Sequence, residues 1–309
     1  MCIRDRVSIL GWLFASIGAI LLAIVFGELS KIYNKEPGGP YKFTRNVFGE
    51  FPAFLVAWGY WISIWSTNTA IVVAFLGYLS VFIPSLNTSP LYSIITGLSI
   101  IWLLTWINSK EIKTIGFVQK ITVILKVIPI ILVGIIGIFF IDFNNFYLLD
   151  ISNDFSFNSI TVTTTLTFFA FLGMESATIP SDKINSPNSI IKKATLYGTI
   201  FTIIIYILSS ISIMGIIPPT TLAQSSAPFA DAAEVIAGDY SRKVIALGAI
   251  IATIGALNGW ILIQGQIPMA ASKDKLFPKF FSKTNNNKSP VFGIILSSIG
   301  MVCSNSIHE

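Results

Sequence analysis

The sequence is poor in the residues that carry most enzyme chemistry. Of its 309 residues one is histidine, His308, and two are cysteines, Cys2 and Cys303, which lie near opposite ends. No cluster of thiols and imidazoles is available for a metal ion, and no Ser-His or Cys-His pair suggests a nucleophile. We therefore expect neither a metal nor another cofactor, and we predict that the protein is not an enzyme.

Charged residues are also scarce. They make up 11% of the chain, whereas 53% of the residues are apolar and the mean hydropathy is +0.76. A soluble domain carries about 25% charged residues, so this composition indicates a protein that crosses a membrane several times. The net charge of +5 does not indicate nucleic-acid binding, because the basic residues gather in alternate loops between the apolar stretches.

Long apolar stretches, in contrast, are abundant. A membrane-spanning helix needs about 20 mostly apolar residues. We predict an all-α, polytopic membrane helical bundle with eight spans, at 8–28, 51–83, 90–108, 115–141, 158–180, 194–216, 243–270 and 290–304. The second stretch is longer than the bilayer requires, so we expect that helix to tilt or bend.

The loops between these spans differ in charge. Most lysines and arginines fall in loops 29–50, 109–114, 181–193 and 271–289, whereas the alternate loops carry Asp142, Asp150, Asp154 and Asp231. Because positively charged loops remain in the cytoplasm, we predict that the four basic loops are cytoplasmic and that the protein lies in the plasma (inner) membrane.

The first six residues conflict with this orientation. A cytoplasmic loop at 29–50 requires the chain to start outside, yet Arg4 and Arg6 stand there. The segment has neither the apolar run nor the cleavage site of a secretory signal. We interpret residues 1–6 as a non-native scar, and residues 7–309 as a core fragment that lacks a preceding span and the helices after 304. We expect the fragment to be inactive by itself.

One acidic residue, Glu175, lies well inside an apolar stretch. A carboxylate at membrane depth costs several kcal/mol and commonly marks the path of an ion, a proton or a substrate. Gly173 and Pro180, on either side of it, weaken the helix there. We predict a proton-coupling role for Glu175. The alternative is an interfacial position, because the cytoplasmic end of the span is only about five residues, or roughly 7–8 Å, away.

A basic residue, Lys126, lies at comparable depth. It follows about eleven residues of its span, which corresponds to roughly 16 Å of helix, near the middle of the bilayer. Burial disfavours the charged ammonium, so we predict that Lys126 can also exchange a proton during function.

Polar side chains follow one face of the second span. Tyr60, Ile64, Thr67, Asn68 and Ile71 recur at helical spacings of three and four residues. This pattern is typical either of a substrate-binding face or of interhelical packing by small polar residues. For Asn68 both interpretations stay open, and for Thr67 we favour packing.

Several motifs together resemble those of the amino acid–polyamine–organocation permeases. They are Glu36-Pro-Gly-Gly-Pro-Tyr41, Phe48-Gly-Glu-Phe-Pro52, Gly59-Tyr-Trp61, Phe171-Leu-Gly-Met-Glu-Ser-Ala177, Ser226-Ala-Pro-Phe-Ala-Asp-Ala-Ala233, Gly259-Trp260 and Asp274-Lys-Leu-Phe-Pro278. The strongest resemblance is to the branch of arginine/agmatine and putrescine/ornithine antiporters. It implies a fold of twelve helices, ten of them in two inverted repeats of five, in which the eight spans would be helices two to nine.

The resemblance also implies roles for individual residues. Tyr60 and Asn68 match substrate-contacting positions, Phe169 matches an aromatic gate, and Gly173 matches an unwound bend at the substrate. Trp260 resembles another cavity or gate aromatic. The alternatives are core or lipid-facing packing for Phe169, close helix packing for Gly173 and an interfacial position for Trp260. The segment from Pro228 to Ile236, which follows Ser226 and precedes Gly238, reads as a short capped helix, which the family uses as an extracellular lid.

These observations predict a secondary transporter for an amino acid or amine. We expect alternating access, with Tyr60, Asn68, Ile71, Phe169, Gly173 and Trp260 binding substrate, and with protons exchanged at Glu175 or Lys126. The expected partners are the substrate, protons and the lipid bilayer; a homodimer stays open, and nucleic acid is not expected. The alternatives are a channel, for which the expected repeated rings of polar residues are not evident, or a membrane scaffold.

Overall fold

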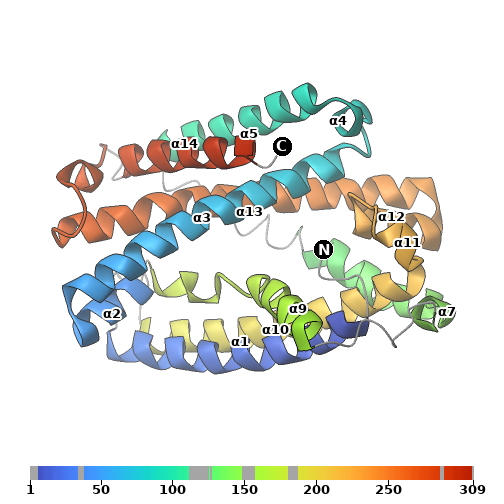
Figure 1. Ribbon diagram of the computed structural model, residues 1–309, viewed down its shortest axis with the longest axis horizontal. Coiled ribbons are helices and arrows are strands. Elements are labelled where there is room, and N and C mark those ends of the chain that lie inside the picture. The colour runs from blue at the N-terminus through green and yellow to red at the C-terminus, as the bar shows by residue number, and fades with distance from the viewer. Residues whose placement is uncertain are drawn as a thin grey trace. The chain divides into compact units, whose positions relative to one another are not determined.

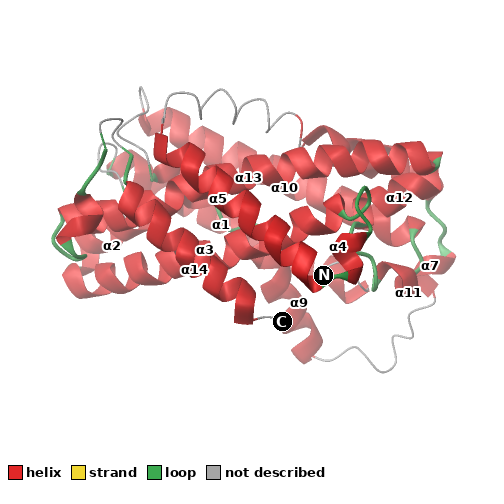
Figure 2. Cartoon of the chain, turned by 90° about the horizontal axis from the view of Figure 1, so that it is seen from above, coloured by secondary structure: helices red, strands yellow, loops and turns green. Residues whose placement is uncertain are grey.

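The computed structural model describes residues 6–33, 38–110, 125, 127–147, 157–179, 187–285 and 289–307. Within these residues all regular secondary structure is helical and no strand is present, as Figure 2 shows. The all-α fold class is therefore confirmed. Among the described residues, five helices are long and apolar enough to cross a membrane: Ile9–Ile32, Glu50–Leu79, Pro90–Lys110, Ile190–Ile216 and Asp239–Lys273.

The chain forms two compact units, whose helices are labelled in Figure 1. The first unit comprises the described parts of Met1–Asn34, Val127–Ala177 and Asn185–Ala246. The second unit comprises the described parts of Lys35–Lys126, Thr178–Ile184 and Leu247–Glu309. Helix α13 (Asp239–Lys273) contributes its first residues to the first unit and the remainder to the second.

In the first unit, α1 (Arg6–Ile32) packs along α9 (Phe157–Phe169) and α10 (Pro187–Ile216), as seen in Figure 1. The face of α1 that meets them carries a small residue at every fourth position. These residues are Gly11, Ala15, Ala19, Ala23 and Gly27, and all five are buried. A Cβ atom on Gly11 would lie 2.7 Å from Cγ2 of Thr163 in α9, so the close approach requires glycine there.

Shorter helices complete the first unit. An apolar helix covers Val127–Phe140, with its last turn in η1 (Ile138–Phe140), and α7 (Asn144–Tyr147) follows it. Two side chains join this region to α10, because Ser212 Oγ donates to Gly134 O at 2.7 Å and Asn145 Nδ2 donates to Gly215 O at 2.8 Å. Apolar residues of α11 (Pro219–Leu222) and α12 (Pro228–Ala237) pack against the same core.

Helix α12 corresponds to the short helix predicted at Pro228–Ile236. It extends one residue further, and Gly238, at φ 79°, ends it in a conformation that favours glycine. The expected capping by Ser226 is wrong. The N-cap residue is Ala227, whose backbone N–H donates instead to Ser225 Oγ at 3.2 Å.

The second unit contains α3 (Glu50–Leu79), α5 (Pro90–Lys110), α14 (Val291–Ile307) and most of α13. Shorter helices lie at α2 (Pro40–Phe48), α4 (Ser85–Thr88) and η4 (Lys279–Ser282). One core cluster is rich in aromatic rings, with Trp61 in T-shaped contact with Phe277 at 5.8 Å and with Phe281 at 5.3 Å. Such contacts hold the loop after α13 against α3.

The helix boundaries differ from the predicted spans in several places. Helix α3 ends at Leu79, four residues before the apolar stretch does, and α10 starts at Pro187, seven residues before its predicted span. The helix α2 was not predicted, because the loop 29–50 was assigned only by its charge. The start of the predicted span 115–141 and residues 1–5 lie outside the described residues. The number of spans and the scar stay predictions.

Candidate functional site

The helix that leads to Glu175 is interrupted. Helix α9 ends at Phe169, residues 170–173 form a turn, and the 3-10 helix η2 (Met174–Thr178) follows. Gly173 has φ 106°, in the region that favours glycine, and its backbone N–H donates to Glu175 Oε2 at 3.0 Å. The interruption predicted from Gly173 is thus confirmed. Glu175 is buried, and its carboxylate stabilises the bend by accepting this hydrogen bond.

The bend is packed on one side by aromatic residues of the first unit. Phe171 is buried and lies 5.6 Å from Trp12 and 5.8 Å from Tyr206, measured between ring centroids. Phe169 behaves differently, because its side chain is 44% exposed at the end of α9. The roles suggested for Phe169, as a gate or as a packing residue, stay predictions.

The polar face predicted on α3 lies partly on the buried side of that helix. The buried stripe runs through Ala53, Ala57, Trp61, Ile64, Asn68, Val72 and Phe75. Tyr60, Thr67 and Ile71 are partly exposed and border this stripe. The hydroxyl of Thr67 donates to Ser63 O at 2.9 Å within its own helix, as expected for a packing role.

Asn68 joins α3 to α13. Its Nδ2 donates to Gln264 Oε1 at 2.9 Å, and Gln264 Nε2 in turn lies 3.2 Å from Ile294 O and 3.1 Å from Ser298 Oγ in α14. The Oδ1 atom of Asn68 is buried and has no hydrogen-bond partner among the described residues. The NH2 group of Asn68 therefore links two helices, whereas its Oδ1 atom is an acceptor without a donor among the described residues.

Two further polar links join the helices of the second unit. Asn108 Nδ2 in α5 donates to Asn258 Oδ1 in α13 at 2.8 Å, and Trp61 Nε1 in α3 donates to Ser297 Oγ in α14 at 2.7 Å. Neither Asn108 nor Gln264 was predicted as a site residue. Both are amides inside apolar stretches, the same kind of position that drew attention to Glu175 and Lys126.

Trp260 lies one turn before Gln264 on α13. It is partly buried and packs, like Tyr60, against the aromatic cluster of the second unit that includes Trp61. The residues predicted to bind substrate or to exchange protons thus divide between the units. Tyr60, Asn68, Ile71 and Trp260 belong to the second unit, whereas Phe169, Gly173 and Glu175 belong to the first. Lys126 lies outside the described residues.

Two of the motifs that carried the family resemblance meet in the second unit. Tyr41 Oη donates to Asp274 Oδ2 at 2.7 Å, Lys42 Nζ lies 3.1 Å from the same oxygen, and Arg45 Nη1 lies 2.8 Å from Oδ1. All of these groups lie in α2 or just after the end of α13, outside the five long apolar helices. One carboxylate therefore gathers three donors from a single short helix.

The electrostatics of this cluster follow from its contacts. Burial acts to raise the pKa of Asp274, but the hydrogen bonds from Tyr41 and Lys42 and the charges of Lys42 and Arg45 outweigh burial, so the pKa is lowered. Burial and the hydrogen bond to Asp274 raise the pKa of Tyr41. Asp274 is thus held ionised and Tyr41 neutral.

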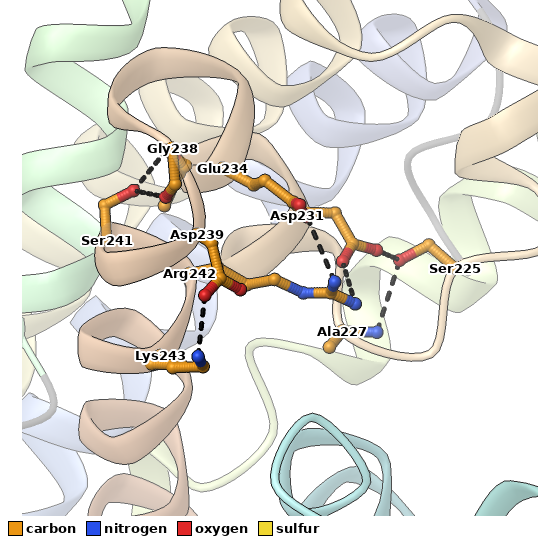
Figure 3. Close-up of polar contacts among 10 residues, drawn as sticks. Ser225, Ala227, Asp231, Glu234, Gly238, Asp239, Ser241, Arg242 and Lys243 are labelled. Carbon is orange, nitrogen blue, oxygen red and sulfur yellow. Dashed lines mark hydrogen bonds and ion pairs between the residues drawn. The ribbon is translucent and has the colours of Figure 1, made fainter. Parts of the chain in front are cut away.

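A second group of charges lies where α12 meets α13, as Figure 3 shows. Arg242 Nη2 lies 3.3 Å from Asp231 Oδ1, and its Nη1 lies 3.1 Å from Glu234 Oε2. Ser225 Oγ donates to Asp231 Oδ2, and Ser241 Oγ donates to Ala233 O at 2.6 Å. One arginine therefore spans the joint between the two helices by contacting both carboxylates of α12.

The fold and the interrupted helix together define the protein as a helical membrane protein. The sequence profile of the amino acid permease family matches residues 6–304, and the chain belongs to that family.

Three relatives of known name are similar to it. The putrescine transporter PotE of Haemophilus influenzae is 31% identical over 94% of this chain and 66% of its own length. The cadaverine/lysine antiporter of Escherichia coli K12 is 29% identical over 96% and 66%, and the arginine/ornithine antiporter of Pseudomonas aeruginosa PAO1 is 29% identical over 94% and 62%. The chain spans about two thirds of the length of these relatives.

Proposed function

We propose that the protein is a secondary transporter, an antiporter that moves a cationic amino acid or amine by alternating access. The observation that carries this proposal is the interruption of an apolar helix at residues 170–173, next to the buried Glu175. Secondary transporters build their sites from such discontinuous helices, because the bend frees backbone groups and tolerates a charge at depth. A channel would instead need polar rings along a pore.

The substrate class is proposed from the relatives and from the polar groups. The named relatives carry putrescine, cadaverine, lysine, arginine or ornithine, all of which bear at least one side-chain or terminal cation at neutral pH. A carboxylate at Glu175 and an unused acceptor at Asn68 favour a ligand of positive charge. Tyr60, Ile71, Phe169 and Trp260 would supply apolar and aromatic contacts.

Proton coupling is proposed for Lys126 and Glu175. A lone ammonium near the middle of the bilayer is neutral for part of the cycle, because its span offers no acidic partner. Lys126→Ala should therefore flatten the pH dependence of transport more than it weakens substrate binding. If Glu175→Gln flattens the profile and Lys126→Ala does not, the carboxylate is the coupling group and the assignment to Lys126 is wrong.

We further propose that loops 29–50, 109–114, 181–193 and 271–289 face the cytoplasm. With Cys2 and Cys303 replaced by serine, a cysteine at Asn286 should react with an impermeant maleimide only from the cytoplasmic side. A cysteine at Gln224 should react only from outside. Labelling of both from one side would contradict the orientation and the span count.

Transport is tested by counterflow in liposomes. The complete reading frame that contains this chain is reconstituted into vesicles loaded with unlabelled lysine, ornithine, putrescine or cadaverine, and uptake of the labelled compound is followed. The proposal predicts saturable uptake that depends on a cationic compound inside. Equal uptake into empty and loaded vesicles, or passive flux that does not saturate, would favour a channel or a scaffold.

A further inference from the structure

Gln264 in α13 lies outside the predicted site but forms hydrogen bonds with Asn68, Ile294 and Ser298. We propose that Gln264 is a positioning residue that fixes the amide of Asn68, so that its oxygen is offered to the ammonium group of the substrate. This proposal rests on the proposed function, because it takes a cationic substrate as given. The new element is Gln264, which would make the site prefer a ligand group that donates a hydrogen bond.

The direction is set by a backbone group. The carbonyl oxygen of Ile294 can only accept a hydrogen bond, so the Gln264 atom 3.2 Å from it must be the amide nitrogen. The Ser298 hydroxyl lies 2.9 Å from the same carbonyl and 2.7 Å from Thr105 Oγ1, so another acceptor is available for its single hydrogen. Toward Gln264 Nε2, at 3.1 Å, Ser298 Oγ is therefore the acceptor. Two acceptors thus use both hydrogens of the Gln264 amide nitrogen.

This arrangement propagates to Asn68. With its nitrogen bound to α14, Gln264 must turn Oε1 toward α3, where it accepts from Asn68 Nδ2 at 2.9 Å. The Oδ1 atom of Asn68 then points away from Gln264 and is left buried without a partner among the described residues. A flipped Gln264 would place its oxygen against Ile294 O, with two acceptors facing each other. The observed direction is therefore the one that satisfies the most groups.

The unused oxygen determines what can approach it. A buried acceptor without a donor is unfavourable, and an ammonium or guanidinium group relieves it, whereas a carboxylate or methyl group does not. Asn68 alone could offer either its NH2 group or its oxygen, because an asparagine amide can rotate by 180°. Gln264 removes that choice, and so sets the preference for a cation.

Lysine and norleucine separate this effect from general damage, because they differ only in the terminal ammonium. Their binding to the full-length protein is measured by isothermal titration calorimetry for wild type and for Gln264→Met, with Gln266→Met as a matched control on the same helix. We expect Gln264→Met to weaken lysine binding about tenfold, the effect of a lost charge-assisted hydrogen bond. Norleucine binding should change less than about twofold, and Gln266→Met should leave the lysine-to-norleucine ratio at the wild-type value.

Two further variants keep the test decisive if Gln264→Met does not fold. Ser298→Ala removes one of the two acceptors of Gln264 Nε2, and should lower the ratio about two- to threefold. Asn68→Asp presents an acceptor in either rotation, so adding it to Gln264→Met should restore the ratio. An unchanged ratio in Gln264→Met, or in Ser298→Ala if the former does not fold, overturns the proposal. If wild type binds neither lysine nor another cationic amine, the proposed function itself fails.

Discussion

Helix α1 of the first unit and the long helices of the second unit pack through contacts of different kinds. In the first, α1 meets α9 and α10 through glycines and alanines spaced by four residues, and the ion pair between Glu28 and Lys192 links α1 to α10. In the second, amide, hydroxyl and indole groups form hydrogen bonds between α3, α5, α13 and α14. The interrupted helix belongs to the first unit, and the amide pairs belong to the second.

This difference suggests a division of work. Contacts between small residues let helices approach closely but have no fixed direction. Hydrogen bonds between buried side chains have a defined direction and fix the register of their helices. We infer that the second unit is the more rigid of the two and presents Asn68 in one orientation, whereas the first unit bends at residues 170–173.

The largest expected effect falls on the second unit, at Asp274. Asp274→Ala removes the acceptor of Tyr41 and the counter-ion of Lys42 and Arg45. We expect the free energy of unfolding to fall by about 2–3 kcal/mol in detergent, because hydrogen bonds to charged groups are lost. The matched control is Glu50→Gln, which removes a more exposed partner of Arg45 and should cost less than about 0.5 kcal/mol. If both variants lose the same free energy of unfolding, the contacts of Asp274 do not stabilise the fold.

The same cluster gives a dependence on pH. The pKa of Asp274 is lower in the folded protein than its ordinary value of 3.8, so the unfolded state takes up the proton first as the pH falls. The stability that Asp274 contributes is therefore complete above about pH 5, and is lost as the pH falls below 3.8 toward its folded pKa. Asp274→Asn should remove this part of the acid unfolding curve. A curve identical to that of wild type would contradict the assigned contacts.

The next effect tests the packing of the first unit. Gly11→Ala places a methyl group 2.7 Å from Thr163 Cγ2 and 3.2 Å from its backbone carbon, so α1 and α9 must separate. We expect a loss of about 1–3 kcal/mol, as for other overpacked contacts. Gly198→Ala in α10 is the control, because no atom lies within 4 Å of the new methyl group. Unfolding in detergent should distinguish the two, and a loss as large for Gly198→Ala would contradict the packing described.

A similar magnitude is expected at the bend itself. Gly173 has φ 106°, a conformation that costs an alanine about 1–2 kcal/mol. Gly173→Ala should therefore straighten or displace the turn. It should lower the maximal rate of counterflow by more than the loss in free energy of unfolding would explain. A variant with full transport would show that the bend is not used.

The smallest effect concerns the joint between α12 and α13. Arg242→Gln removes the contacts with Asp231 and Glu234, which are partly exposed, and should cost about 1 kcal/mol or less. Lys243→Gln, which removes a more exposed pair with Asp239, should have no measurable effect. The Arg242 effect should shrink in high salt, because screening weakens partly exposed pairs. A loss independent of salt would indicate packing of the arginine stem instead.

Much of this organisation could be predicted from the sequence. The helical fold follows from the long apolar stretches, and the interruption follows from Gly173 beside an intramembrane acid. Residues that act through partners were harder to find. The role of Asp274 depends on Tyr41, which lies 233 positions away, and that of Gln264 depends on Ile294 in another helix. Neither pairing has a local pattern, because tertiary contacts create both.

Helix ends and small-residue contacts show a second limit. The spacing of Gly11, Ala15, Ala19, Ala23 and Gly27 is visible in the sequence, but only the structure shows which helices it meets. Helix α2 escaped prediction because it is short and lies in a loop of high charge. Proline at its first position and glycine at both flanks were the local signs of its boundaries.

Amide hydrogen exchange tests the contrast between the units most directly. The full-length protein in detergent is compared with and without lysine at millimolar concentration, and exchange is followed by mass spectrometry in residues 170–178 and 60–72. We expect fast exchange in 170–178 that lysine slows severalfold, because substrate orders the bend. Residues 60–72 should exchange slowly in both conditions. Equal protection of the two segments, or exchange in 170–178 that no cationic amine changes, would contradict the division into a rigid and a bending unit.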